Sequence, residues 1–183
     1  MVLLWIALVI IALIAVILIY YFNKFVVLGN RIDNSLSQID VQLRRRADLI
    51  PNLLESVKGY MKHEKGVISE VTNARKALVG ARGLPDRVKA GNKLQSALSH
   101  LFAIAENYPN LKANENFLQL QNELSSTEDK IAYSRQYYND SILSYNNSVQ
   151  TFPGALFAGM FGKKKREFLQ IPAAAREVVK VKF

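Results

Sequence analysis

The sequence predicts an all-α protein in which an N-terminal transmembrane helix is followed by an elongated antiparallel bundle of long helices. An uncharged apolar stretch opens the chain, and apolar residues then recur every three or four positions through most of the remainder. That period is typical of helices with one buried stripe. No segment shows the sustained apolar-polar alternation of a half-exposed strand, so we expect no sheet.

The first element is the uncharged stretch from Val2 to Phe22, dominated by Leu, Ile, Val and Ala. About 21 residues at about 1.5 Å each are enough to span a hydrocarbon core. A cleaved signal peptide has a basic start and ends in small residues, whereas this stretch begins without a basic residue and ends in Tyr20, Tyr21 and Phe22. We therefore predict an uncleaved transmembrane anchor over residues 1–23.

Basic residues flank this anchor on its C-terminal side only, at Lys24, Arg31 and the run 44–46. Positively charged flanks favour the cytoplasmic side of a membrane. The sequence therefore predicts a single-pass protein of the cell (inner) membrane whose soluble part is cytoplasmic.

The bundle is predicted over residues 24–151, and its first helix carries an apolar stripe from Ile32 to Ile50. Asp48 and then Pro51 interrupt the pattern, and proline lacks the N–H that an interior helical hydrogen bond needs. We therefore expect a kink or a restart near Pro51.

Two further helices follow from the same periodicity. The stripe resumes at Leu54 and continues to Leu78, and a third helix is predicted from Val88 to Ala105. Turn-forming residues end each of them, namely Gly80, Gly83 and Pro85 for the first and Asn107 to Asn110 for the second.

The clearest periodicity runs over residues 117–149 and predicts a helix of roughly 35 residues, about 50 Å long. Its apolar seam is unusually hydrophilic, because it includes hydroxyl groups at Thr127, Ser134, Tyr138 and Tyr145. The seam is either solvated or covered by another chain, and tyrosine is frequent at interfaces. We interpret it as a self-association surface and predict a homo-oligomer.

The third predicted region, residues 152–183, starts with apolar residues and continues with a cluster of cations. These residues are Phe152, Leu156, Phe157 and Phe161, followed by Lys163, Lys164, Lys165 and Arg166. The apolar part is too short to span a bilayer, and the combination is typical of a segment at the headgroup boundary of an anionic membrane. Alternatively, the phenylalanines pack on the bundle and the cations are only solvated. The pattern does not predict how the remaining tail packs.

The chain has a formal net charge of +9 and contains no cysteine. The positive charge favours anionic surfaces, and a tethered chain meets lipid headgroups first, so we expect anionic lipid rather than nucleic acid as a partner. Plain solubility is the simpler alternative. The absence of cysteine excludes disulfides, thiol nucleophiles and a lipidated cysteine.

Three consecutive guanidiniums, Arg44, Arg45 and Arg46, precede Asp48. On a helix they point in three directions, so at least one faces the apolar side. We expect it to form an ion pair, within the chain or between subunits, with Asp48 or another carboxylate.

No group of residues indicates an enzyme. His63 and Glu64 are not followed by the second histidine of a zinc-protease helix, and Gly154 and Gly159 lack the lysine and the preceding strand of a phosphate loop. We predict no catalytic residue, no metal and no cofactor.

Two long segments resemble signatures of the LemA family of bacterial membrane proteins. They are SQIDVQLRRRADLIPNLLESVKGYMKHE, from Ser37 to Glu64, and YPNLKANENFLQLQNELSSTEDKIAYSRQYYNDSILSYNNSVQTFPG, from Tyr108 to Gly154. The resemblance implies a membrane anchor followed by a long-helix bundle, and it supplies no catalytic residues. Some members begin with a lipidated cysteine, which this chain lacks.

These inferences favour a membrane-anchored helical scaffold that self-associates. The alternative is an adaptor or regulator of a membrane protease or another envelope quality-control machine, with a different membrane protein as partner. A hydrolase or metalloenzyme is a third reading, which would need a polar pocket with a metal or convergent carboxylates.

Overall fold

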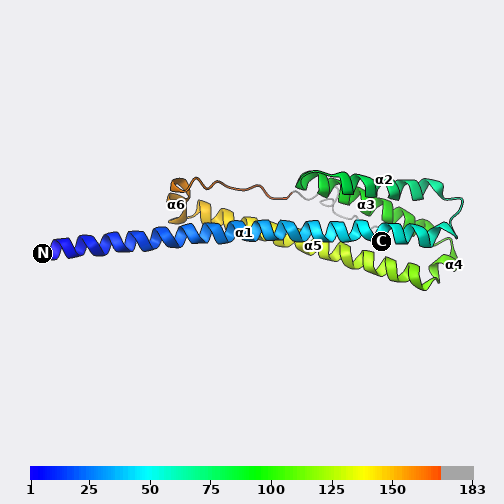
Figure 1. Ribbon diagram of the computed structural model, residues 1–183, viewed down its shortest axis with the longest axis horizontal. Helices are drawn as coiled ribbons and strands as arrows, with labels where there is room; N and C mark the ends of the chain where they lie inside the picture. Colours follow the sequence, from blue (N-terminus) through cyan, green and yellow to red (C-terminus); the bar gives the residue numbers. More distant parts are fainter. Residues whose placement is uncertain (170–183) are drawn as a thin grey trace, which may run out of the picture. The chain divides into compact units, whose positions relative to one another are not determined.

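A computed structural model describes residues 1–169, and all the regular secondary structure in that range is helical (Figure 1). The predicted all-α class with a long apolar N-terminal helix is confirmed. The tail beyond residue 169 lies outside the described residues. The helices are α1 (Val2–Lys58), α2 (Lys65–Gly80), α3 (Leu84–Ala105), α4 (Pro109–Lys112), α5 (Glu115–Gln150) and α6 (Gly154–Met160).

The chain divides into two compact units. The first contains residues 1–36 and, in the described part, 135–169, while the second contains residues 37–134. Both α1 and α5 contribute to each unit, because the unit boundaries fall inside these two helices.

The second unit is a bundle of antiparallel neighbours. Tyr60 and Asn114 are joined by a side-chain hydrogen bond of 3.4 Å near the ends of α1 and α5. Arg46 of α1 pairs further along with Glu128 of α5, so these two helices run in opposite directions. The bundle core includes the fully buried side chains of Ile39, Ile50, Leu53, Leu94, Leu98, Leu101, Leu124 and Ile131.

The prediction of a break near Pro51 is wrong, because α1 continues through Pro51 and ends at Lys58. Proline cannot donate the helical hydrogen bond to the carbonyl four residues earlier, which belongs to Ala47. Here the Nε–H of Arg75, in α2, donates to that carbonyl oxygen at 2.8 Å. The orphaned acceptor is therefore satisfied, and the chain reverses only after Lys58.

The predicted helix from Leu54 to Leu78 is interrupted, because α1 ends at Lys58 and α2 begins at Lys65. The other two helix predictions agree with the structure more closely. The third predicted helix is α3, and the long helix predicted over residues 117–149 is α5. The hydroxyl of Thr127 is buried and donates to the Leu124 carbonyl oxygen of its own helix at 2.8 Å. The polar character of that part of the seam is therefore satisfied within one chain.

The first unit packs α1 against the C-terminal part of α5 and against α6. Its core cluster comprises Phe25, Leu28, Ile32, Ile142, Tyr145, Val149 and Ala158. The residues alternate by three and four along both long helices, so each helix buries one stripe.

Candidate membrane-contact site

The predicted anchor is helical from Val2 onward and mostly exposed. Residues 2–17 all have exposed side chains, with Trp5 at 65% and Leu13 at 57% of full exposure. This part of α1 is long and apolar enough to cross a membrane. A helix from a soluble core would bury such a surface, whereas none of this apolar window is buried within the described chain.

Helix α6 packs beside the end of this apolar stretch, within the first unit. The ring of Phe157 stacks on Tyr21 with 4.9 Å between centroids. Phe161 meets Phe22 edge to face at 5.4 Å. Because Tyr21 and Phe22 end the apolar stretch, α6 lies at the level where the stretch stops.

Gly154, the first residue of α6, permits this close packing. A Cβ added there would lie 2.1 Å from the carbonyl oxygen of Ser148 and 3.2 Å from the Cε1 atom of Tyr21. No side chain fits at such a distance from backbone. Only glycine therefore allows α6 to approach both α5 and α1.

The apolar residues predicted to contact the membrane lie in α6 or next to its ends, and they differ in exposure. Phe152 and Leu156 are exposed, at 83% and 62%, whereas Phe157 and Phe161 are partly buried and pack on the core cluster. Met160 is also exposed, at 68%. Residues four apart share a helix face, so that spacing could have identified Met160 from the sequence.

The four predicted cations follow α6 in a segment without regular secondary structure, and their surroundings differ. Lys164 and Lys165 are exposed and Lys163 is half-buried. The Arg166 guanidinium forms an ion pair with Asp33 at 3.3 Å. Its Cζ atom also lies 5.3 Å from the centroid of the Tyr145 ring. Arg166 is thus engaged by the protein, and the lysines present the charge to solvent.

The two tyrosines predicted at an oligomer interface both belong to the first unit. Tyr145 is buried in its core, and Tyr138 is half-buried against that core. Burial raises the pKa of Tyr138 above its ordinary value, although the positive charge of Arg166 acts in the opposite direction. Little of the Tyr145 side chain is left for contact with another chain.

The arginine run is placed in the second unit, where one of the three guanidiniums is inside. Arg46 is 2% exposed, and its two Nη groups donate to Glu128 and to Gln95. Arg44 pairs on the surface with Asp48 at 3.4 Å, and Arg45 is exposed. The buried cation is therefore neutralised by a residue 82 positions away, a partner that local spacing could not identify.

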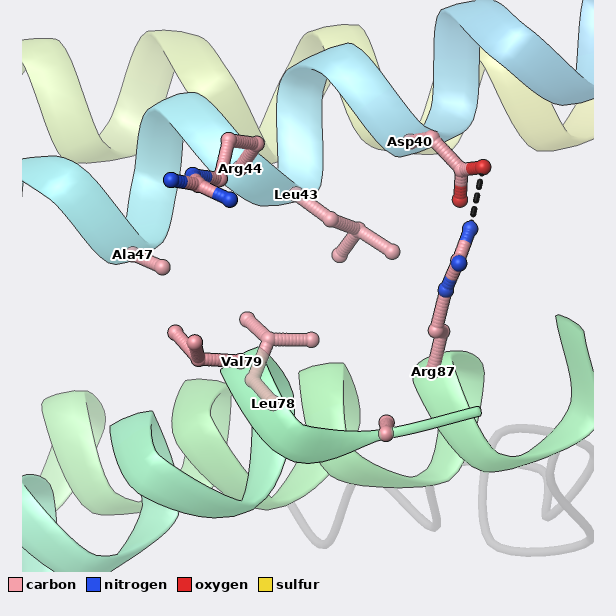
Figure 2. Close-up of a pocket in the computed structure, with 8 residues that line it drawn as sticks. Asp40, Leu43, Arg44, Ala47, Leu78, Val79 and Arg87 are labelled. Atoms are coloured by element: carbon pink, nitrogen blue, oxygen red, sulfur yellow. Dashed lines mark hydrogen bonds and ion pairs between the residues drawn. The ribbon is translucent and has the colours of Figure 1, made fainter. Parts of the chain in front are cut away.

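The second unit also contains a pocket of about 220 Å³, shown in Figure 2. Leu43, Leu78 and Val79 form apolar walls, and an ion pair between Arg87 and Asp40 closes one end. The second carboxylate oxygen of Asp40 is buried without a hydrogen-bond partner. Arg44 also lines the pocket and pairs with Asp48, so each charged side chain around this cleft has a partner of opposite charge.

Within residues 1–169 no group of three or more His, Asp or Glu side chains is arranged to hold a metal ion. His100 pairs with Glu70 at 2.9 Å, and His63 lies exposed in the loop before α2.

Comparison with known proteins identifies related sequences. A family model described as LemA family matches residues 35–183. The chain is 31% identical over 127 residues to Protein LemA of Metamycoplasma hominis, covering 67% of this chain and 57% of that protein. It therefore spans less than two thirds of this relative's length.

Two magnetosome proteins are also similar. Magnetosome protein MamQ 2 of Paramagnetospirillum magneticum is 26% identical over 187 residues, covering 88% of this chain and 68% of the relative. Magnetosome protein MamQ of Magnetospirillum gryphiswaldense is 27% identical over 173 residues, covering 80% and 64% respectively. None of these names describes an enzymatic reaction.

Proposed function

This chain belongs to the LemA family, and from that premise we propose that it is a membrane-anchored helical scaffold that self-associates at the membrane surface and catalyses no reaction. In this proposal, the apolar part of α1 spans the cell membrane once and the other helices lie in the cytoplasm. Helix α6 and the lysines after it form a second contact, with anionic lipid.

The observation that supports the membrane contact in this proposal is the packing of α6 on Tyr21 and Phe22, at the end of the apolar stretch. If that stretch fills the hydrocarbon core, these two aromatic residues lie at the interface, where aromatic side chains are enriched. The exposed face formed by Phe152, Leu156 and Met160 then lies at the same depth. Burial in the headgroup region would remove this apolar face from water.

Electrostatics support the same placement. The three lysines at positions 163–165 follow the apolar face directly. A basic residue near an anionic membrane surface contributes about 1 kcal/mol, so three of them would contribute several times the thermal energy. The apolar and cationic parts would thus favour the same location.

A tryptophan experiment tests this contact, because the chain contains a single tryptophan. Trp5→Phe would be combined with Met160→Trp, and the full chain would be reconstituted in anionic vesicles that contain lipids with brominated acyl chains. Bromine quenches nearby indole fluorescence, so we expect strong quenching at position 160. Tyr133→Trp in the same background is the control, since Tyr133 is as exposed as Met160, at 68%, but lies in the second unit.

Equal, weak quenching at positions 160 and 133 would contradict the interfacial placement of α6. Strong quenching at 160 alone would support it.

Self-association has its own measurement. We expect the purified full chain in lipid nanodiscs or detergent to form particles larger than one copy at micromolar concentration, as judged by light scattering. A monomer under those conditions would remove the scaffold proposal. Capture of one different protein in fixed stoichiometry by crosslinking in cells would instead favour the adaptor function.

A further inference from the structure

Residues 163–169, which we term the strap, run without secondary structure after α6 in the first unit (Figure 1). Two asparagines of α5 hold its backbone. The Asn146 side chain donates to the Arg166 carbonyl oxygen at 2.8 Å and accepts from the Arg166 N–H at 2.8 Å. Asn139 holds Leu169 in the same way, at 3.2 Å to the carbonyl oxygen and 2.9 Å from the N–H.

The spacing of the two asparagines matches an extended peptide. Asn139 and Asn146 are two helical turns apart, which is about 10.5 Å along α5. Arg166 and Leu169 are three residues apart, which is about 10 Å in an extended chain. The later strap residue is held by the earlier asparagine, so the strap runs antiparallel to α5. The two side-chain amides therefore form a site that recognises extended backbone whatever its side chains are.

Side chains in the same place add a preference for arginine. Arg166 is paired with Asp33 of α1 at 3.3 Å and lies over the Tyr145 ring. A carboxylate combined with an aromatic face suits a guanidinium better than an ammonium. The guanidinium is planar, so it can stack on the ring while it pairs with the carboxylate. The site thus accepts an extended peptide that carries arginine at one position.

The strap lies on the surface, but the site beneath it is buried. Lys164, Lys165 and Phe168 are exposed, whereas Asn146 is 2% exposed. Gly162 precedes the strap with a φ of 61°, a conformation that glycine adopts without strain. If the strap left, the buried amide would lose two hydrogen bonds, which is costly without replacement. An empty site would therefore favour a second extended peptide.

We propose that this second peptide is the strap of a neighbouring copy, so that copies exchange straps at the membrane surface. The inference rests on the proposed self-association and names its contact. Exchange preserves the contacts of Arg166 and Leu169 and changes the chain near Gly162, which makes it a low-cost route to assembly. Copies anchored by the same helix share one orientation and depth, so a neighbour's strap is presented at the depth of the site.

The length of the strap limits which copies could exchange it. Arg166 is four positions after Gly162, and a fully extended chain reaches about 14 Å over four positions. Helices packed side by side lie about 8–10 Å apart. Exchange therefore requires the site of the neighbour to lie within about 14 Å of Gly162, so only copies in direct contact could exchange straps.

A charge-exchange experiment tests the proposal. One full-length copy carries Asp33→Arg and another carries Arg166→Asp, each with a different affinity tag. In either variant alone, residues 33 and 166 carry charges of the same sign, so they repel each other within one copy and between two copies. When the two are co-expressed, a matched pair forms only between copies, because Arg166 of the first meets Asp33 of the second and the two replaced residues meet each other.

We expect each variant alone to form few multimers in nanodiscs, and co-expression to restore mixed particles that both tags retain, several-fold above either alone. Glu167→Lys is the matched control, because it reverses an exposed charge one residue from Arg166 and should leave assembly unchanged. The double variant in one chain should assemble like the original protein. Circular dichroism melting of each variant would separate assembly defects from unfolding.

The outcomes distinguish this inference from the proposed function. If the original protein assembles but co-expression restores no mixed particles, strap exchange is wrong and self-association stands. If single variants assemble as well as the original protein, the strap is again not the contact. If the original protein is monomeric, both the proposed self-association and strap exchange are wrong.

Discussion

At the scale of single residues, the second unit depends on arginines whose partners are distant in sequence. Arg75 donates to the Ala47 carbonyl oxygen that Pro51 leaves without its helical donor. Arg46 is buried and is neutralised by Glu128. In each case a charged side chain satisfies a group that would otherwise be buried and unpaired, and such groups cost about 1–3 kcal/mol or more.

Replacing Arg75 with methionine should destabilise the protein by about 1–2 kcal/mol, because it leaves the Ala47 carbonyl without a donor. In a Pro51→Ala background the same replacement should cost clearly less, since residue 51 then supplies the helical N–H. Denaturant unfolding of the four proteins in detergent would give this coupling free energy. Equal costs in the two backgrounds would show that Arg75 does not act through Ala47.

Arg46→Met should cost about 3 kcal/mol, at the lower end for a broken buried ion pair. The Glu128 side chain is 33% exposed, so water can partly solvate the carboxylate that remains. Arg45→Met is the control, because Arg45 is exposed and its replacement should change the free energy of unfolding by less than about 0.5 kcal/mol. A similar loss in both variants would contradict the assignment of Arg46 as the buried partner.

At the scale of elements, α6 is too short to be stable on its own, since isolated helices below about 12 residues are marginal in water. Its position is set by packing, through Phe157 on Tyr21, Phe161 on Phe22, and the contact that Gly154 permits. The same packing exposes the opposite apolar face.

Gly154→Val should displace α6, because its Cβ would overlap the Ser148 carbonyl oxygen. We expect a cost of about 1–3 kcal/mol from the overpacking. Tryptophan quenching at position 160 should also fall in brominated anionic vesicles. Gly159→Ala is the matched control, because a Cβ there meets nothing within 4 Å, and a helical alanine should be neutral or stabilising by about 0.5–1 kcal/mol. Loss of quenching in both variants would argue against a specific role of Gly154.

At the scale of the whole molecule, the chain combines a net charge of +9 with a long exposed apolar helix. These two features predict different dependences of membrane binding on lipid charge and salt. Apolar surface binds any bilayer, whereas the lysines discriminate between anionic and zwitterionic lipid. Salt should weaken only the second contribution, because it screens exposed charges.

Replacing Lys163, Lys164 and Lys165 together with glutamine should therefore leave the protein in the membrane but remove its preference for anionic lipid. Quenching at position 160 should rise with phosphatidylglycerol content in the parent and become insensitive to it in the variant. Glutamine at Lys62, Lys65 and Lys76, which are exposed in the second unit, changes the net charge equally and serves as control. An equal response from both triple variants would show that the net charge of the protein, and not the position of the lysines, determines the preference for anionic lipid.

The sequence by itself determined what depends on local pattern. The period of apolar residues located α3 and α5 almost to their ends, and the uncharged stretch after Val2 indicated a helix able to cross a membrane. These features were predictable because helix geometry repeats within a few residues, so each stretch of sequence carries the information for its own structure.

Only the tertiary structure decided which local rules were overruled and which side chains meet. Pro51 does not end α1, because the Ala47 carbonyl that it leaves without a donor accepts from a side chain 28 residues after Ala47. The apolar residues of α6 divide into a packed face and an exposed face, and two asparagines of α5 hold the strap 20 and 30 residues further on. Such pairings join positions far apart in the chain, and periodicity within one segment contains no information about its partner.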